Sequence, residues 1–284
     1  MAKEYGKKTV YPVLSILIPC ILGIIGMARN GVSIAIWIQN PLAILLLSVA
    51  CWLILKCDFK YNNKAVVFAA VLLLGLTFLG PNIEGVHRWL RLPFFTLNIA
   101  AMVIPIAIIA LYRLVEERQF VISMVGITVI AVLLSLQPDA SQLLAFSLPM
   151  MILLWKSEVS KIAASGLSGI LVFLTAMSWS RLDALQPVDY TEGILTMLQD
   201  VSIVLYIVGL AALFCVPIYF LISCKEKNRR IWTGIAVYYW LTILSTFAGN
   251  SPVPFMGYGI SPILGFYAVF IWFMIEDKDW AHSK

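Results

Sequence analysis

Asp139 is the residue in this sequence with the clearest potential for chemistry. It follows Gln137 and Pro138 at the junction of two long apolar segments, and no basic residue lies near it in the sequence. An ionised carboxylate between apolar helices is costly, so it usually faces a cavity or a partner, where it can serve as a general base. The alternative is structural: Asp139 caps the following helix by accepting hydrogen bonds from backbone N–H groups near Gln142.

A compact basic and aromatic patch is formed by His87, Arg88, Trp89 and Arg91. Arginine forks match the oxygens of phosphate groups, and arginine tolerates partial desolvation better than lysine, so one interpretation is an anion site. The other is an interfacial anchor, with Trp89 in the headgroup region and both arginines on ordinary lipid phosphates. The patch alone favours the second interpretation.

Two further segments, one rich in proline and glycine and one acidic, are weaker candidates for a site. The stretch from Ser251 to Pro262 contains Pro254, Phe255, Tyr258 and Ser261, and it predicts either a re-entrant loop beside a cavity or a plain turn. The acidic residues between Ser180 and Asp200 could bind a divalent cation, but their spacing fits no known ligand pattern. Such residues, Asp183 among them, are more typical of solvated loops, so no cofactor is predicted with certainty.

The elements that must position these residues are apolar helices. Hydrophobic residues make up 61% of the 284 residues, charged residues only 12%, and the mean hydropathy is +0.93. This composition excludes a soluble enzyme and a disordered chain, because soluble domains carry about 25% charged residues. The apolar runs do not alternate with a period of two, which argues against a β-barrel. We therefore predict an all-α polytopic membrane protein.

Polar breaks divide the chain into ten apolar segments, which predict about ten transmembrane helices. The sixth and tenth are short, and we expect both to extend into the polar, proline-containing breaks that precede them. The predicted segments are Val10–Met27, Ile34–Leu55, Ala65–Gly80, Leu97–Leu114, Phe120–Leu136, Leu143–Trp155, Ile162–Trp179, Val201–Cys224, Ile231–Phe247 and Ile263–Ile275.

The distribution of basic residues predicts the orientation. With the N-terminus inside, 16 of the 20 Lys and Arg residues fall on the inner side of the membrane and 4 on the outer side. This is a strong positive-inside signal, and it predicts that both termini are cytoplasmic. The net charge of +5 is thus an orientation signal rather than a sign of nucleic-acid binding. Residues 1–284 are predicted to form a single transmembrane domain.

Three outer segments, in this order, resemble motifs of the SEDS family of bacterial membrane proteins. Gly85-Val86-His87-Arg88-Trp89 matches the family's Gly-x-x-Arg-Trp, and Gln137-Pro138-Asp139 matches its Gln-Pro-Asp. The stretch from Pro254 to Ser261 resembles its Pro-Phe-x-Ser-Tyr-Gly-Gly-Ser motif. The family has ten helices with both termini in the cytoplasm, in agreement with the predicted topology.

The resemblance implies a peptidoglycan glycosyltransferase of the bacterial cytoplasmic membrane that polymerises lipid II at the outer face, in cell shape, division or sporulation. Asp139 would be the catalytic base, and Arg88, with Arg91 secondary, would meet the undecaprenyl diphosphate leaving group. His87, Trp89, Gln137 and the residues Pro254, Phe255, Tyr258 and Ser261 would help to bind substrate. The implied partner is a class B penicillin-binding protein, and a divalent cation is possible.

The departures from the family pattern motivate other functions. The family carries a Glu and a Lys on its fourth helix, whereas this chain has Asn98-Ile99-Ala100-Ala101 and then Ile104 at those positions. Losing both together leaves no buried charge without a partner. A non-catalytic SEDS-like scaffold or regulator of a cell-wall synthesis complex is therefore an alternative. A transporter of lipid-linked precursors is a further one, although no matching polar site on the inner side supports alternating access.

Overall fold

The computed structural model describes residues 2–57, 61–80, 82–93, 95–249 and 251–282. The chain divides into two compact units, each built from segments that are far apart in the sequence. Residues 1–61, 187–219 and 243–284 form unit 1, and residues 62–186 and 220–242 form unit 2. Lys60 and Lys284, which enter the count of inner basic residues, lie outside the described residues.

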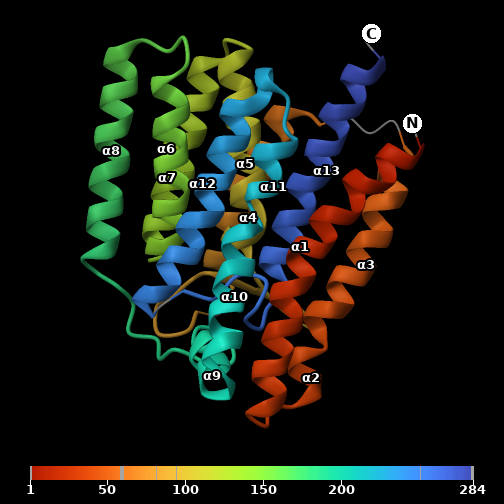
Figure 1. Ribbon diagram of the computed structural model, residues 1–284. Helices are drawn as coiled ribbons and strands as arrows, with labels where there is room; N and C mark the ends of the chain where they lie inside the picture. The colour runs from red at the N-terminus through yellow and green to blue at the C-terminus, as the bar shows by residue number, and fades with distance from the viewer. Residues whose placement is uncertain (1, 58–60, 81, 94, 250, 283–284) are drawn as a thin grey trace. The chain divides into compact units, whose positions relative to one another are not determined.

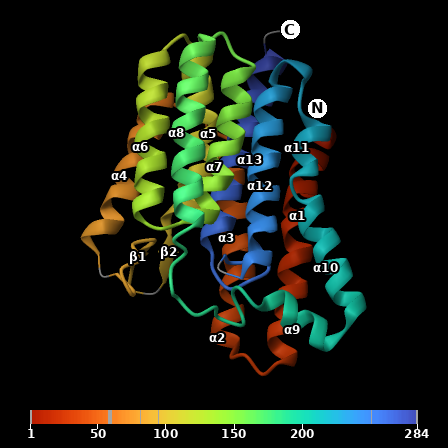
Figure 2. The ribbon, with the colours of Figure 1, turned by 90° about the vertical axis from the view of Figure 1, so that its left-hand side faces the viewer.

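Unit 2 is a helical bundle with a small β-hairpin at one end (Figures 1 and 2). Helix α5 packs against α4, α6 and α7, and α8 packs against α6 and α7. Most of α5 is buried, whereas most of α8 is not, so α5 is the core helix and α8 presents an apolar surface suited to lipid. The elements of this unit are α4 (Asn63–Leu76), η1 (Thr77–Leu79), β1 (Trp89–Arg91), β2 (Thr96–Asn98), α5 (Ile99–Glu116), α6 (Phe120–Leu136), α7 (Ala140–Trp155), α8 (Lys161–Trp179), η2 (Glu226–Asn228) and most of α12 (Arg229–Ser245).

Unit 1 is centred on the long first helix. Helix α1 packs against α3, α9 and α10, and α3 also packs against α13. The backbones approach closely where Gly23 of α1 meets the carbonyl oxygen of Met256, because a Cβ atom on Gly23 would overlap that oxygen. The elements are α1 (Ala2–Arg29), α2 (Ile34–Trp37), α3 (Gln39–Ile54), α9 (Ile194–Val201), α10 (Ile203–Cys215), η3 (Thr246–Ala248) and α13 (Ser261–His282), and α11 (Ile218–Ser223) crosses the division between the units.

The predicted helical class is confirmed, and helices cover most of each predicted segment. The second and eighth segments are interrupted, at Ile38 and at Val216-Pro217, and Leu97, the predicted start of the fourth, lies in β2. Among the described residues, six helices are long and apolar enough to cross a membrane, and four shorter apolar helices accompany them. The tenth segment extends into its break as expected, because α13 begins at Ser261. The sixth begins earlier than predicted, at Ala140, but it stops short of its break, because Asp139 is the N-cap of α7. The start of α1 and the end of α13 lie at the same end of unit 1 (Figure 1), as an even number of crossings requires.

The hairpin formed by β1 and β2 was not predicted. It pairs Trp89 with Asn98 and Arg91 with Thr96 in antiparallel register. Each strand has only three residues, too few for an alternating pattern to stand out in the sequence. The hairpin ends where Asn98 caps α5 by accepting a hydrogen bond from the backbone N–H of Ala101, at 3.1 Å. The hairpin thus places Arg88, the residue just before β1, next to the start of α5.

Candidate functional site

The junction of α6 and α7 positions Asp139. Helix α6 ends at Leu136, and Asp139 is the N-cap of α7. Its Oδ1 atom accepts hydrogen bonds from the backbone N–H of Gln142 at 3.2 Å and from the Ser141 hydroxyl at 3.0 Å. The capping interpretation of Asp139 is therefore correct. The cap uses only one of the two carboxylate oxygens, so the interpretation of Asp139 as a general base stays open.

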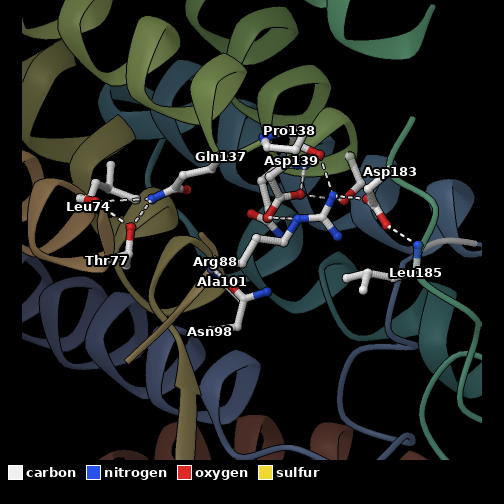
Figure 3. Close-up of polar contacts among 12 residues, drawn as sticks. Leu74, Thr77, Arg88, Asn98, Ala101, Gln137, Pro138, Asp139, Asp183 and Leu185 are labelled. Atoms are coloured by element: carbon white, nitrogen blue, oxygen red, sulfur yellow. Dashed lines mark hydrogen bonds and ion pairs between the residues drawn. The ribbon is translucent and has the colours of Figure 1, made fainter. Parts of the chain in front are cut away.

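Hydrogen bonds of Gln137 hold this junction against the end of α4. Its Nε2 atom donates to the carbonyl oxygen of Leu74 at 3.1 Å and to Oγ1 of Thr77 at 2.8 Å. The Thr77 hydroxyl itself donates to the Leu74 carbonyl at 2.7 Å. All three residues are buried, and unmade hydrogen bonds are expensive in such surroundings. These hydrogen bonds fix the position of the α6–α7 junction, and with it Asp139, relative to the end of α4 (Figure 3).

Arg88 reaches Asp139 from the residue that precedes β1. Its backbone carbonyl accepts a hydrogen bond from the N–H of Ile99 at 3.2 Å, which ties it to the start of α5. The side chain is buried and points between Asp139 and Asp183 (Figure 3). The Nη2 atom donates to the carbonyl oxygen of Pro138 and to Oδ2 of Asp183. The Nε atom lies 3.7 Å from Oδ2 of Asp139, an ion pair without a hydrogen bond.

The three charged side chains form one buried cluster with an excess of one negative charge. The side chains of Asp139 and Asp183 are only 3% and 4% exposed, and that of Arg88 is 9% exposed. Within the described residues, Oδ2 of Asp139 and Nε of Arg88 have no hydrogen-bond partner. Buried polar atoms of this kind are uncommon and require an explanation. An oxygen with open lone pairs beside a guanidinium can accept a proton from a hydroxyl group of a ligand.

The other predicted residues of the patch lie around this cluster in different roles. The ring of His87 stacks on Phe78, with 5.2 Å between the ring centroids. Trp89 is half-buried on β1, and Arg91 is exposed on the same strand. Arg88 is therefore the arginine that the fold brings to Asp139, while Arg91 faces outward, as an interfacial residue does. In the part of the chain that the structure describes, no group of three or more His, Cys, Asp or Glu side chains could hold a metal ion.

Residues 254–260 belong to unit 1 and form a packed, non-helical segment there, and Ser261 begins α13. The backbone N–H of Tyr258 donates to the carbonyl of Tyr190 at 2.9 Å, and Asn40 donates to the carbonyl of Gly257 at 2.8 Å. Phe255 is buried with its ring edge against Phe266.

Irregular backbone of this kind is tolerated at membrane depth only when protein or a cavity covers it, and here protein covers it. The predicted roles of Pro254, Phe255, Tyr258 and Ser261 in binding substrate beside Asp139 stay predictions.

Sequence reasoning missed two residues of the site. The sequence places Asp183 among the charges typical of solvated loops, yet the structure buries its side chain against Arg88, 95 positions away in the chain. Tyr238 of α12 donates a hydrogen bond to Oε1 of Gln142 at 2.9 Å, so it supports the first turn of α7 beneath Asp139. No local pattern marks Asp183 in the sequence, because its contact with Arg88 joins positions that are far apart in the chain.

No family model matches the sequence, and no curated protein sequence matches it. Solved structures do match. The rod shape determining protein RodA of Thermus thermophilus aligns at a TM-score of 0.69 with 16% identity, covering 94% of this chain and 96% of RodA. The chain has the RodA fold. A variant of the same RodA aligns at a TM-score of 0.71, also at 16% identity and over 95% of this chain and 96% of the RodA chain.

A chain from a peptidoglycan synthase complex that coordinates polymerization and crosslinking aligns at a TM-score of 0.66 and 16% identity, over 94% of this chain and 97% of its own length. RodA and this chain match over nearly the whole of both aligned chains. The SEDS-like fold that the three sequence motifs predicted is confirmed. At 16% identity the likeness concerns the fold, and activity has to be argued from the site.

Proposed function

We propose that this protein is a peptidoglycan glycosyltransferase that uses lipid II in the bacterial cytoplasmic membrane. The observation that carries the proposal is the buried pair of Asp139 and Arg88, in which one carboxylate oxygen is held by the helix cap and the other has no hydrogen-bond donor among the described residues. The RodA fold and the matching motif positions support a role in cell-wall synthesis. The site itself supports the transfer chemistry.

In the proposed reaction, the 4-hydroxyl oxygen of the acceptor sugar attacks the anomeric carbon of the donor. The bond between that carbon and the diphosphate oxygen breaks, and undecaprenyl diphosphate leaves with the electron pair. Asp139 takes the hydroxyl proton at Oδ2, the oxygen that the cap leaves open. Arg88 offers positive charge beside the place where negative charge develops, which stabilises the transition state more than the ground state.

The proposal extends to the partner and the process. A SEDS-type polymerase extends glycan strands, and a class B penicillin-binding protein crosslinks them. The match to a chain of a peptidoglycan synthase complex supports this pairing. Cell shape, division and sporulation are the three processes such an enzyme would serve.

The decisive experiment is polymerisation of lipid II by the purified protein in detergent or liposomes, with Asp139→Asn as the test variant. Asparagine is as good an N-cap as aspartate, so the variant should fold while losing the base. We expect the wild-type chain to form glycan polymer and the variant to lose at least about a hundredfold of the rate, within the usual contribution of a general base. Equal polymer from both proteins would refute the assignment of Asp139.

A non-catalytic scaffold of a cell-wall synthesis complex is the second candidate. The observation that favours it is that Arg88 is already engaged by Asp183 and by the Pro138 carbonyl, while Ala101 and Ile104 leave α5 apolar. A scaffold would give no polymer in the assay above. In cells, a scaffold would also keep its function in an Asp139→Ala strain. An enzyme that needs Asp139 as its base would lose its function in that strain.

A further inference from the structure

We propose that Asp183 is an exchangeable partner of Arg88, and that the diphosphate group of a lipid-linked substrate or product displaces it. The Asp183 carboxylate would occupy, in the ligand-free protein, the position that a phosphate oxygen takes in the complex. The inference rests on the proposed function for the identity of the ligand. It adds a residue that sets the affinity of the site for that ligand.

The geometry of Arg88 is the first argument. Both hydrogens of Nη2 have acceptors, the Pro138 carbonyl and Oδ2 of Asp183. A phosphate oxygen cannot bind this nitrogen until one of the acceptors leaves. The carbonyl is part of the fixed junction between α6 and α7, so Asp183 is the acceptor that can move (Figure 3).

The charge of the cluster is the second argument. One buried guanidinium already faces two carboxylates, and a diphosphate would add at least one more negative charge within a few ångströms. Like charges at such distances repel one another even when they are partly screened, and burial makes the screening weaker. Release of Asp183 into water removes one of these negative charges and leaves Arg88 free to pair with the phosphate.

The segment that carries Asp183 is the third argument. Residues 182–186 form no helix or strand, and most of them are exposed. Among the described residues, the contact with Arg88 is the one hydrogen bond that ties residues 182–186 to a distant part of unit 2. The other bond of the carboxylate is local, from the backbone N–H of Leu185 to Oδ1 at 3.2 Å. Breaking one contact is thus enough to free the segment, with no helix to unwind.

The test is binding of farnesyl diphosphate, a short polyprenyl diphosphate, to the purified full-length protein, measured by titration calorimetry. Asp183→Asn removes the competing charge and keeps a side chain of the same size, so it should bind farnesyl diphosphate about tenfold more tightly. Asp189→Asn removes a carboxylate from an exposed position close by in sequence and should leave the affinity unchanged. Arg88→Gln should abolish the gain when combined with Asp183→Asn.

Unchanged or weaker binding by Asp183→Asn would overturn the proposal. The outcome is separate from that of the polymerisation assay. If the wild-type chain makes polymer but Asp183→Asn shows no gain in affinity, the assignment as an enzyme stands. The same result refutes the displacement of Asp183 by the diphosphate.

A second measurement uses the wild-type chain and does not depend on a variant that folds. Arg181 is exposed directly before residues 182–186, and trypsin cleaves after arginine. If the diphosphate releases Asp183, farnesyl diphosphate should accelerate cleavage after Arg181, and farnesol, which lacks the charged group, should not. Protection of Arg181, or equal cleavage with both compounds, would count against the exchange.

Discussion

The two carboxylates around Arg88 predict a strongly non-additive effect on stability. Asp139→Asn leaves Arg88 paired with Asp183, and Asp183→Asn leaves it paired with Asp139. Each single variant keeps one counter-charge and most hydrogen bonds, so each should lower the free energy of unfolding by only about 1 kcal/mol. The asparagine of the Asp139→Asn variant would also retain the cap of α7. Neither change alone leaves the buried guanidinium without a counter-charge.

The double variant removes both counter-charges from a guanidinium whose side chain is 9% exposed. A buried charge that loses its partners costs about 3–5 kcal/mol. The loss of free energy of unfolding in the double variant should therefore exceed the sum of the two single losses by about 1–3 kcal/mol. A coupling of this size is typical of residues in one network. Adding Arg88→Gln to the double variant removes the unpaired charge and should restore part of the loss.

Unfolding of the detergent-solubilised protein can be followed by the fluorescence of its nine tryptophans. The comparison needs the wild-type chain, both single variants, the double variant, the triple variant with Arg88→Gln, and Asp189→Asn as a control for loss of an exposed carboxylate. Additive effects of the two substitutions, or a triple variant less stable than the double variant, would refute the description of one shared cluster.

Two further substitutions test the supports of the site and of the segment in unit 1. Gln137→Leu should lower the free energy of unfolding by about 1–3 kcal/mol, because Thr77 and the carbonyl of Leu74 lose a buried hydrogen-bond donor. A chemical denaturation curve measures this loss. If the curve shows no loss, the amide of Gln137 is dispensable for stability. Gly257→Ala should cost about 1–3 kcal/mol in the same measurement, since its Cβ would overlap the carbonyl oxygen of Thr191. Gly166→Ala, whose Cβ meets nothing within 4 Å, is the matched control and should show no such loss.

The helices could be predicted from the sequence because uniformly apolar runs of this length have few alternatives in a membrane. The junction of α6 and α7 was predictable for a local reason, since Asp139 and Gln142 are three positions apart and the cap needs nothing else. Both interpretations of Asp139 could hold together because a carboxylate has two oxygens. The cap accounts for one of them and leaves the other for Arg88.

The parts that could not be predicted depend on contacts between distant segments. Nothing local distinguishes Asp183 from Asp189, yet one is buried against Arg88 and the other is exposed. The hairpin that orients Arg88 has strands too short to leave a pattern. The hydrogen bond from Tyr258 to Tyr190 likewise joins residues far apart in the chain, which a single sequence does not connect.

The two carboxylates come from different kinds of element, which fits the proposed roles of Asp139 as a fixed base and of Asp183 as a movable counter-charge. The SEDS-like motif would place a Glu and a Lys on the helix that corresponds to α5, but Ala101 and Ile104 are buried there among apolar neighbours. The core helix therefore contributes no charge to Arg88. Asp139 is held by the cap of α7 and cannot leave without disturbing that helix, whereas Asp183 is carried by an irregular segment. Under the function and the exchange proposed above, such a site would keep its proton acceptor in place when its second carboxylate departs, which a pair of carboxylates on one rigid helix could not do.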